Sequence, residues 1–276
     1  MIIREALDAL TAILFPAPCR ICVRPLTNAT RVPICETCLS SFECIAEPMC
    51  KCCGRPFIAA LAAHSLPPLC RLCRANLYSF SRARSFAIYN DALGAAIVLL
   101  KYEEVRRLGD WFARQLAETL ARHGEDFRAD VIVPVPLHPE RQRERGYNQA
   151  DLIARPLAHR LGVKLRSDVL VRTRPRPAQL VLSRTERWKS VRGAYATRAG
   201  VRVDKLRVLL VDDVMTTGAT LDSCARALRK AGAAEVFGLT VARLVPGWSP
   251  SAPPQQRGSS KASKPADSSS IQKGER

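Results

Sequence analysis

The chain has 276 residues, of which 47% are hydrophobic and only 6% aromatic, so a core would rely mainly on aliphatic side chains. Its 43 lysines and arginines against 25 acidic residues give a net charge of +18, which favours anionic partners such as phosphorylated metabolites, nucleic acids or acidic lipids. No stretch reaches the roughly 18 apolar residues of a membrane-spanning helix, and residues 1–15 predict an amphipathic helix on the body rather than a signal peptide. We therefore expect a cytoplasmic protein without a transmembrane segment.

Ten of the eleven cysteines lie between residues 19 and 73, and eight of them form four Cys-x-x-Cys pairs. Twelve residues separate the first two pairs and sixteen separate the last two, a spacing typical of four-thiolate zinc sites. The segment has too few periodic apolar residues for a core of its own, so metal binding would supply its folding energy. The predicted ligands are Cys19, Cys22, Cys35, Cys38, Cys50, Cys53, Cys70 and Cys73.

Other uses of these cysteines fit the pattern less well. Disulfides are disfavoured in a cytosolic chain, and a redox Cys-x-x-Cys pair would normally occur once. An iron–sulfur cluster stays open as an alternative, although the two-by-two spacing favours zinc. The spacing does not decide which pair joins which, and Cys52 could replace its neighbour Cys53 as a ligand. Cys224 is interpreted as a small core residue and His64 as a loop residue. Four thiolates leave no open position on a metal, so we expect a scaffolding or recognition role.

From residue 79 onwards, strand and helix patterns alternate, which is typical of an α/β domain. Residues 137–146 are predicted to be an arginine-bearing loop, and residues 172–195 a long basic loop. The tail 246–276 is rich in Ser, Pro, Lys and Gln and is expected to be disordered. Strands are predicted at 85–89, 130–136, 206–211 and 238–244, and helices at 91–100, 110–123, from about 149 to 161, and 221–230.

The strand at 206–211 is followed at once by two adjacent carboxylates and then by a hydroxyl-rich turn that contains one glycine. The glycine permits a tight turn, and free backbone N–H groups at the start of the next helix favour a phosphate. Threonine hydroxyls can donate to phosphate oxygens, whereas the acid pair suits sugar hydroxyls or Mg²⁺. This order predicts a phosphorylated sugar, and a P-loop fits poorly because no Gly-Lys-Ser/Thr follows the glycine. The predicted binding residues are Asp212, Asp213, Thr216, Thr217, Gly218 and Thr220.

Residues 208–220, VLLVDDVMTTGAT, resemble the phosphoribosyl pyrophosphate loop of type I phosphoribosyltransferases. Together with PVPLHP at 134–139, RERGYNQ at 143–149 and the cysteine pairs, the order of motifs from about residue 2 to 243 is similar to the competence protein F (ComF) family. This resemblance implies an N-terminal helix and Cys-rich double zinc ribbon over 1–78. It implies a type I phosphoribosyltransferase-like parallel sheet flanked by helices over 79–245.

The resemblance also implies roles for single residues. The acid pair would hold the ribose 2′ and 3′ hydroxyls of Mg²⁺–phosphoribosyl pyrophosphate, and the threonine turn its 5′-phosphate. Arg141, Arg143 and Lys101 would stabilise the departing pyrophosphate as catalytic residues, although the arginines alone would fit a solvated basic turn equally well. Residues 172–195 would form a mobile hood over the substrate. Thr216 stands where purine-salvage relatives of the hypoxanthine–guanine type carry an Asp, which argues against that substrate class.

Two functions follow as expectations. The first is a phosphoribosyltransferase, or a protein derived from one, that carries structural Zn²⁺ and supports DNA uptake in natural transformation. The alternative is a single-stranded nucleic-acid-binding protein with a non-catalytic phosphoribosyl pyrophosphate sensor site, which the charge favours and the low aromatic content disfavours. Single-stranded DNA and a helicase of the competence machinery are the candidate macromolecular partners.

Overall fold

The computed structural model describes residues 17–26, 32–57, 69–123, 127–175 and 184–248. Its centre is a five-stranded sheet in the order β1-β7-β6-β2-β3, and every neighbouring pair in it is parallel. The predicted α/β class is confirmed. The strands are β1 (Arg82–Ile88), β2 (Val131–Pro134), β3 (Lys164–Leu165), β6 (Arg207–Met215) and β7 (Glu235–Arg243).

The helices that connect these strands carry clear start and stop signals. The side chain of Asn90 accepts a hydrogen bond from the backbone N–H of Leu93 at 2.9 Å, and that of Asn148 accepts one from Ala150 at 3.0 Å. Gly162 ends the helix after Asn148 in the left-handed conformation, with φ 65°. The helices of the body are α4 (Asp91–Tyr102), α5 (Arg107–Ala121), α6 (Pro139–Arg145), α7 (Gln149–Leu161), α8 (Arg184–Val191) and α9 (Ala219–Lys230).

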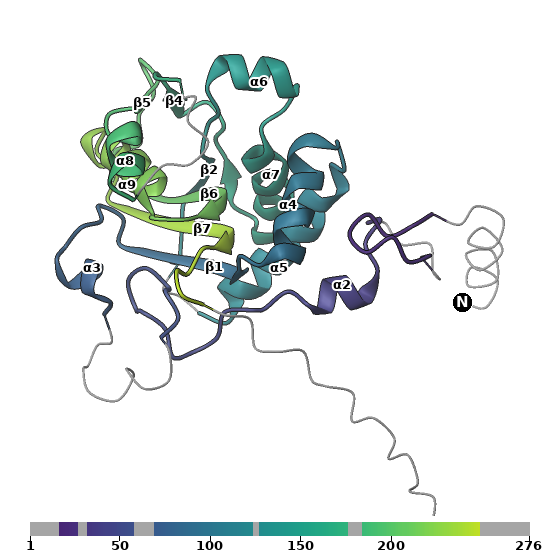
Figure 1. Cartoon of the computed structure of the whole chain (residues 1–276). Coiled ribbons are helices and arrows are strands. Elements are labelled where there is room, and N and C mark those ends of the chain that lie inside the picture. Colours follow the sequence, from purple (N-terminus) through teal and green to yellow (C-terminus); the bar gives the residue numbers. More distant parts are fainter. Residues whose placement is uncertain (1–16, 27–31, 58–68, 124–126, 176–183, 249–276) are drawn as a thin grey trace, which may run out of the picture.

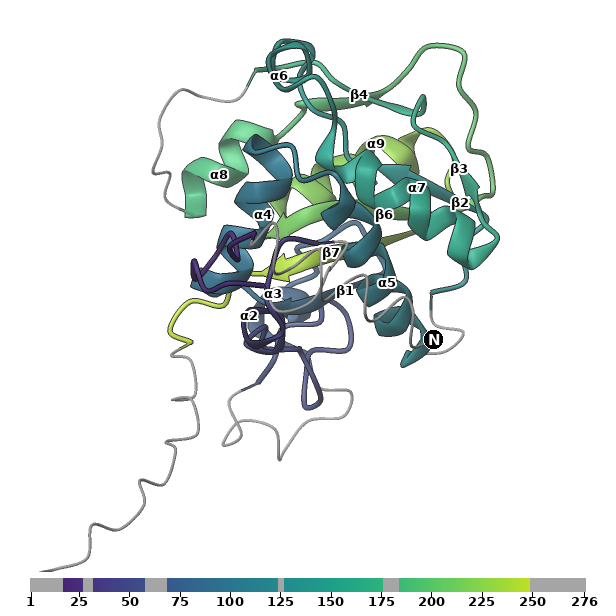
Figure 2. The ribbon, with the colours of Figure 1, turned by 90° about the vertical axis from the view of Figure 1, so that its right-hand side faces the viewer.

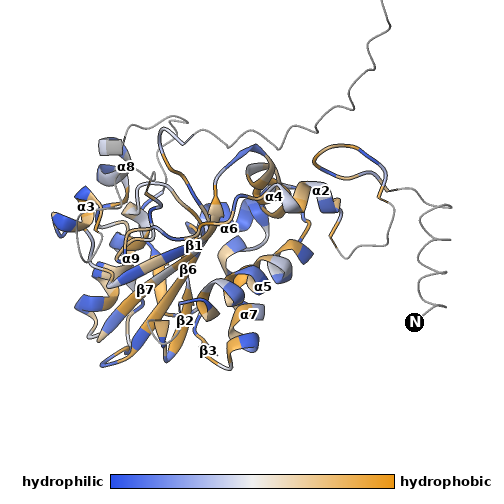
Figure 3. Cartoon of the chain, turned by 90° about the horizontal axis from the view of Figure 1, so that it is seen from below, coloured by the Kyte–Doolittle hydropathy of each residue, from blue (hydrophilic) through white to orange (hydrophobic). Residues whose placement is uncertain are grey.

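Helices cover both faces of the sheet (Figure 1, Figure 2). On one face α4, α5 and α7 share a buried cluster with Leu209 and Val211 of β6. On the other face α9 shares a cluster with Val208 and Leu210. Because side chains alternate across a strand, β6 is buried on both faces, which explains its nearly continuous apolar sequence. The strands accordingly appear mostly orange, the hydrophobic colour, in Figure 3.

The strand order marks the edge of the sheet where a ligand is expected. From β2 the chain crosses to β3 on one side, whereas from β6 it crosses to β7 on the other side. Such a reversal leaves a crevice beyond the carboxyl ends of the two strands where it occurs. All five strands are parallel, so their carboxyl ends gather at a single edge, and the residues after β2 and within the end of β6 meet there.

The loop predicted at 137–146 is wrong in part, because it contains the helix α6. Pro139 lies in the first turn of α6, and Gly146 closes the helix with φ 78°. None of its residues is buried. Hydrophobic periodicity therefore could not reveal this helix, although its proline and glycine signals were present.

The segment predicted as a long basic loop at 172–195 also contains regular structure. It begins in β4 (Leu170–Arg172) and ends in β5 (Tyr195–Thr197), which pair antiparallel as a separate two-stranded sheet. The helix α8 lies between them, and residues 176–183 lie outside the described part. A helix and a ribbon therefore replace much of the predicted loop.

The cysteine-rich segment packs along the outer edge of β1. It contains the short helices α2 (Glu36–Ser40) and α3 (Arg71–Arg74). Phe42 packs edge-on against Trp111 of α5, with ring centroids 5.7 Å apart. Backbone bonds also cover the edge of β1, which would otherwise present free N–H and C=O groups. They run from Ile45 N to Phe86 O at 3.0 Å, from Ala83 N to Cys52 O at 2.7 Å and from Ile88 N to Glu43 O at 2.8 Å.

Three expectations stay predictions. The helix at 1–15, His64 and the greater part of the tail lie outside the described residues. The domain boundaries at 78 and 245 are likewise untested. Within the described ranges, the helices are all too short or too polar to cross a membrane.

Two glycines inside helices provide a test of the packing. A Cβ on Gly109 of α5 would lie 2.6 Å from the backbone oxygen of Leu152 in α7, whereas a Cβ on Gly94 of α4 would meet only the ring end of the partly exposed Tyr89. We expect Gly109→Ala to lower the free energy of unfolding by about 1–3 kcal/mol. Gly94→Ala should be neutral or stabilising by up to about 1 kcal/mol through helix propensity. Urea denaturation measures both, and equal stability of the two variants would contradict the close helix contact.

Candidate functional site

Two buried carboxylates lie near the carboxyl end of the central strand. Asp212 and Asp213 belong to β6 and are only 8% and 5% exposed. Because the two residues are consecutive in a strand, their side chains leave the backbone on opposite faces of the sheet. The backbone N–H of Asp213 donates a hydrogen bond to Asp212 Oδ1 at 2.9 Å. The pair thus stands at the edge where the strand order predicts a ligand.

A lysine from a neighbouring helix neutralises one of the two charges. Lys101, in the last turn of α4, places Nζ 2.9 Å from Asp213 Oδ2. Both side chains are largely buried, which strengthens the interaction relative to a surface pair. The sequence prediction placed Lys101 with the pyrophosphate; the structure places it against the acid pair.

Among the residues that the structure describes, Asp212 has no such direct partner cation. Burial and, to a lesser degree, the negative charge of Asp213 together raise the pKa of its carboxyl to about 8, against the opposing effects of the Asp213 N–H, Lys101 and Arg172. At neutral pH Asp212 therefore holds a proton in the free protein. A ligand that brings a cation or hydroxyl donors to this position would favour the ionised form.

Directly after β6, the chain turns through Thr216 and Thr217 into α9. Gly218 precedes the first residue of α9 with φ 81°, a conformation that side-chain-bearing residues avoid. A Cβ there would lie 2.8 Å from both Met215 Cε and the ring of Tyr78, so only glycine fits. Thr217 Oγ1 accepts a bond from the N–H of Ala219 at 3.3 Å. The other N–H groups at the start of α9 have no partner within the helix, which suits an anion. We call residues 216–220 the cradle.

The two arginines predicted to face the pyrophosphate lie on α6, beyond the carboxyl end of β2. Arg141 and Arg143 are exposed, and Arg141 forms an ion pair with Glu144 at 3.2 Å. In the described part of the chain, no contact joins either arginine to the acid pair. They therefore occupy the predicted edge of the sheet without reaching its centre.

Two further residues lie at this edge: Arg172, which was predicted to belong to the hood over the substrate, and Tyr102, to which no role was assigned. Arg172 at the end of β4 is close enough to act on the pKa of Asp212, and its guanidinium lies 5.5 Å from the ring centroid of Tyr195. The exposed Tyr102 follows Lys101 directly, and the guanidinium of Arg145 lies over its ring at 4.7 Å. The adjacent Lys101-Tyr102 pair was the only signal in the sequence for this tyrosine. A cavity of about 470 Å³ opens between residues 78–81 and the side chains of Arg226 and Arg229 on α9, and no residue of the cradle lines it.

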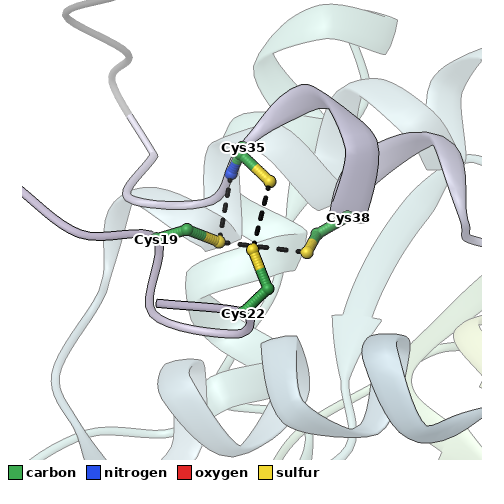
Figure 4. Close-up of side chains that lie close together, drawn as sticks. All are labelled: Cys19, Cys22, Cys35 and Cys38. Carbon is green, nitrogen blue, oxygen red and sulfur yellow. Dashed lines mark hydrogen bonds between the residues drawn. The ribbon is translucent and has the colours of Figure 1, made fainter. Parts of the chain in front are cut away.

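The eight predicted cysteines gather into two clusters, each able to hold a metal ion. The first combines Cys19, Cys22, Cys35 and Cys38, and the second combines Cys50, Cys53, Cys70 and Cys73. The pairing that the spacing left open is therefore sequential. In the first cluster, Sγ–Sγ distances are 3.9 Å for Cys19–Cys38 and 3.6 Å for Cys22–Cys35 (Figure 4). In the second they are 3.7 Å for Cys53–Cys70 and 3.5 Å for Cys70–Cys73.

These distances fit a tetrahedral zinc site. Four sulfurs about 2.3 Å from one ion lie about 3.8 Å from each other. Backbone N–H groups support the sulfurs, since Cys35 N lies 3.3 Å from Cys19 Sγ and Cys70 N lies 3.3 Å from Cys50 Sγ. The sulfur–sulfur distances and these N–H contacts together make the donor set suitable for a cation.

The remaining cysteines take other places. Cys53 rather than Cys52 belongs to the second cluster. The alternative in which Cys52 takes the place of Cys53 as a ligand is therefore not the arrangement in the structure. Cys224 lies on α9 and is fully buried in the core, as predicted. Cys44 is exposed.

A family model and a solved structure are similar to parts of this chain. A family model for the phosphoribosyl transferase domain matches residues 149–251, which include β6, the cradle and β7. Among solved structures, the glutamine phosphoribosylpyrophosphate amidotransferase of Bacillus subtilis has 25% sequence identity and a TM-score of 0.34, over 49% of this chain and 26% of that chain.

Two relatives match over much longer stretches. The DNA utilization protein YhgH of Salmonella typhimurium is 33% identical over 225 residues, which are 80% of this chain and 94% of that protein. Competence protein ComFC of Bacillus subtilis is 30% identical over 218 residues, which are 76% of this chain and 84% of that protein. Because both relatives match over most of their own length, the chain belongs to the competence protein F (ComF) family, with a phosphoribosyltransferase domain behind two four-cysteine clusters.

Proposed function

We propose that the protein binds Mg²⁺–phosphoribosyl pyrophosphate at the carboxyl end of β6 and supports the use or uptake of DNA by the cell. The observation that carries the proposal is the order of groups along one turn. A buried acid pair is followed within eight residues by a glycine-hinged, hydroxyl-rich cradle at the start of α9. Acceptors for a sugar diol and donors for a phosphate thus stand side by side.

Each part of the ligand has a matching group. The carboxylates of Asp212 and Asp213 accept hydrogen bonds from the ribose 2′ and 3′ hydroxyls. The 5′-phosphate takes N–H groups at the start of α9 together with the hydroxyls of Thr216, Thr217 and Thr220. Bound Mg²⁺ would neutralise part of the pyrophosphate charge. The net charge of +18 adds a long-range attraction for this polyanion.

In the transfer reaction, the bond between ribose C1 and the pyrophosphate oxygen breaks, and pyrophosphate leaves with the electron pair. Positive charge develops on C1 and the ring oxygen, and a nitrogen nucleophile then donates its lone pair to C1 and loses a proton. The protein contributes by holding the ribose and by stabilising the departing charge. We assign the stabilisation of that charge to Lys101, which lies beside the acid pair, and to Arg141 and Arg143 on α6, which stand at the same edge of the sheet.

The names of the relatives favour a second candidate function, direct binding of single-stranded DNA, with phosphoribosyl pyrophosphate acting as a signal rather than a substrate. Both relatives carry names that refer to DNA utilization or competence. The excess of basic residues supports such binding. Mutation of the acid pair separates the two candidates.

Calorimetric titration of the zinc-loaded protein with phosphoribosyl pyrophosphate and Mg²⁺ tests the site. We expect Asp212→Ala/Asp213→Ala to weaken binding at least about a hundredfold, because two charge-assisted hydrogen-bond acceptors are lost. Asp110→Ala on the exposed face of α5 is the matched control and should bind as the wild type does. Unchanged binding in the double variant would refute the site. Fluorescence anisotropy with a labelled single-stranded oligonucleotide then shows whether the same variant still binds DNA, as the second candidate requires.

The raised pKa of Asp212 predicts a pH dependence. An ionised carboxylate accepts stronger hydrogen bonds from ribose hydroxyls than a protonated one, so below pH 8 tight binding displaces a proton from Asp212. We expect the dissociation constant for Mg²⁺–phosphoribosyl pyrophosphate to rise about tenfold from pH 9 to pH 7, a range in which phosphate monoesters stay largely doubly ionised. Asp212→Asn should bind more weakly at pH 9 and lose this dependence. A wild-type affinity that is constant across this range would argue against Asp212 as the acceptor.

We also propose that both cysteine clusters hold structural Zn²⁺. The sulfur–sulfur distances support a tetrahedral ion, and with four protein ligands no position is left for substrate. Thiols that hold zinc must stay reduced, so this proposal places the protein in the cytoplasm.

Metal analysis of single cysteine variants tests this assignment. Elemental analysis of the purified wild type should give two zinc ions per chain. Cys53→Ser should retain one, because it removes a ligand of the second cluster, while Cys52→Ser should retain two. Loss of zinc from Cys52→Ser, or iron in place of zinc, would contradict the assignment.

A further inference from the structure

An arginine at the end of β7 lies against the second cysteine cluster. Arg243 is only 2% exposed, and no acidic side chain pairs with it among the residues that the structure describes. Its Nη1 donates to the backbone oxygen of Cys53 at 2.6 Å, and Nη2 lies 3.4 Å from Cys53 Sγ. The guanidinium thus contacts both the backbone oxygen and the sulfur of Cys53, one of the predicted metal ligands.

A metal site explains how this charge can be buried. An unpaired guanidinium in a protein interior is costly, since it loses its hydration without a counter-charge. Four thiolates around one Zn²⁺ carry a net charge of −2. The loaded cluster therefore supplies the counter-charge of Arg243, and Arg243 in turn stabilises the Cys53 thiolate by a hydrogen bond.

The same guanidinium also contacts the strand that leads into the cradle. Arg243 Nη1 lies 2.9 Å from Sδ of Met215, the last residue of β6. The backbone oxygen of Met215 accepts a bond from Leu244 N, the residue after Arg243, at 3.0 Å. Met215 directly precedes Thr216, so these two contacts connect the start of the cradle to the second cluster.

A second connection comes from the chain that leaves this cluster after Cys73. The hydroxyl of Tyr78 donates to the backbone oxygen of Thr217 at 2.9 Å, and its ring fills the space in which a Cβ of Gly218 would lie. Burial raises the pKa of Tyr78, so the hydroxyl stays a donor. The backbone N–H of Ser79 donates to Oδ1 of the buried Asp222, in the first turn of α9, at 2.7 Å.

The first cluster is placed differently. Cys19 and Cys38 pack in the core that contains α4 and α5, on the other face of the sheet from α9. An arginine accompanies this cluster too, since the backbone oxygen of Arg24 accepts a hydrogen bond from the N–H of Cys19 at 2.8 Å. In the described ranges, however, no hydrogen bond joins this cluster or Arg24 to residues 215–222. The two clusters therefore offer a matched comparison.

We propose that the metal held by Cys50, Cys53, Cys70 and Cys73 fixes the shape of the cradle, with Arg243 and Tyr78 as positioning residues. When that metal is lost, Arg243 no longer holds Met215 in place, and Tyr78 no longer holds Thr217 and Gly218. Loss of the metal from the first cluster leaves the cradle in place. The effect on ligand affinity rests on the phosphoribosyl pyrophosphate site proposed above, whereas the effect on the cradle itself does not.

The test uses the zinc-loaded full chain and three substitutions: Arg243→Gln, Tyr78→Phe and, as the control at the first cluster, Arg24→Gln. Zinc release to a chromogenic chelator, hydrogen–deuterium exchange of residues 215–222, and the affinity for Mg²⁺–phosphoribosyl pyrophosphate are measured for each. We expect Arg243→Gln to speed release of one of the two zinc ions at least about tenfold, to speed exchange in 215–222 and to weaken ligand binding about tenfold. Tyr78→Phe should keep both ions at wild-type release rates, yet speed exchange and weaken binding about threefold.

The control defines the specificity of the effect. Arg24→Gln should leave both exchange in 215–222 and ligand affinity within twofold of the wild type, even where it speeds release of the other zinc ion. Equal loosening of the cradle by Arg24→Gln would overturn the proposal, and so would wild-type exchange in both other variants. Should Arg243→Gln not fold, Arg243→Lys keeps the charge beside Cys53 but cannot bridge to Met215, so it should retain zinc and still loosen the cradle. If the wild type binds no ligand, the proposed function fails, while zinc release and exchange still decide the coupling.

Discussion

The burial of two adjacent carboxylates in the central strand is the constraint on which the rest of the body depends. Two adjacent carboxylates cannot both be buried with full charge, so Asp212 is protonated at neutral pH and Asp213 is paired with a cation from outside β6. Lys101 comes from α4 on one face of the sheet, and Arg172 comes from the small β4–β5 sheet. The site is therefore completed by elements that are distant in sequence. A ligand that brings hydroxyl donors or a metal ion to Asp212 would favour its ionised form, which is an electrostatic reason for such a ligand to bind here.

The cysteine-rich segment and the body stabilise each other. The segment is short of apolar residues, so it relies on its clusters and on the side chains it shares with the body, such as Phe42 against Trp111. The body in turn has a strand, β1, whose outer edge would be free without the segment. The two parts thus share one core, although their sequences look like separate modules.

Sequence patterns predicted the parts whose signals are local. The apolar run before Asp212, the Cys-x-x-Cys pairs and the helical pattern from about 149 to 161 each depend on a few neighbouring residues. The helix α6 was missed because it buries nothing, and hydrophobic periodicity therefore does not mark it. The roles of Tyr78 and Arg243 could not be predicted, because Tyr78 meets Thr217 across 139 positions and Arg243 meets Cys53 across 190. Local patterns contain no information on such contacts.

The pairing of the first strand of the sheet with the last has a consequence for the order in which the molecule forms. β1 lies between the cysteine-rich segment and β7, and Ser85 meets Thr240 at 2.7 Å across 155 positions of the chain. During synthesis, β1 and the second cysteine cluster emerge long before the strand that completes their packing. Contacts of such long range slow folding, because a large loop must close before they form. Metal binding by the early segment would keep its cysteines protected during this interval.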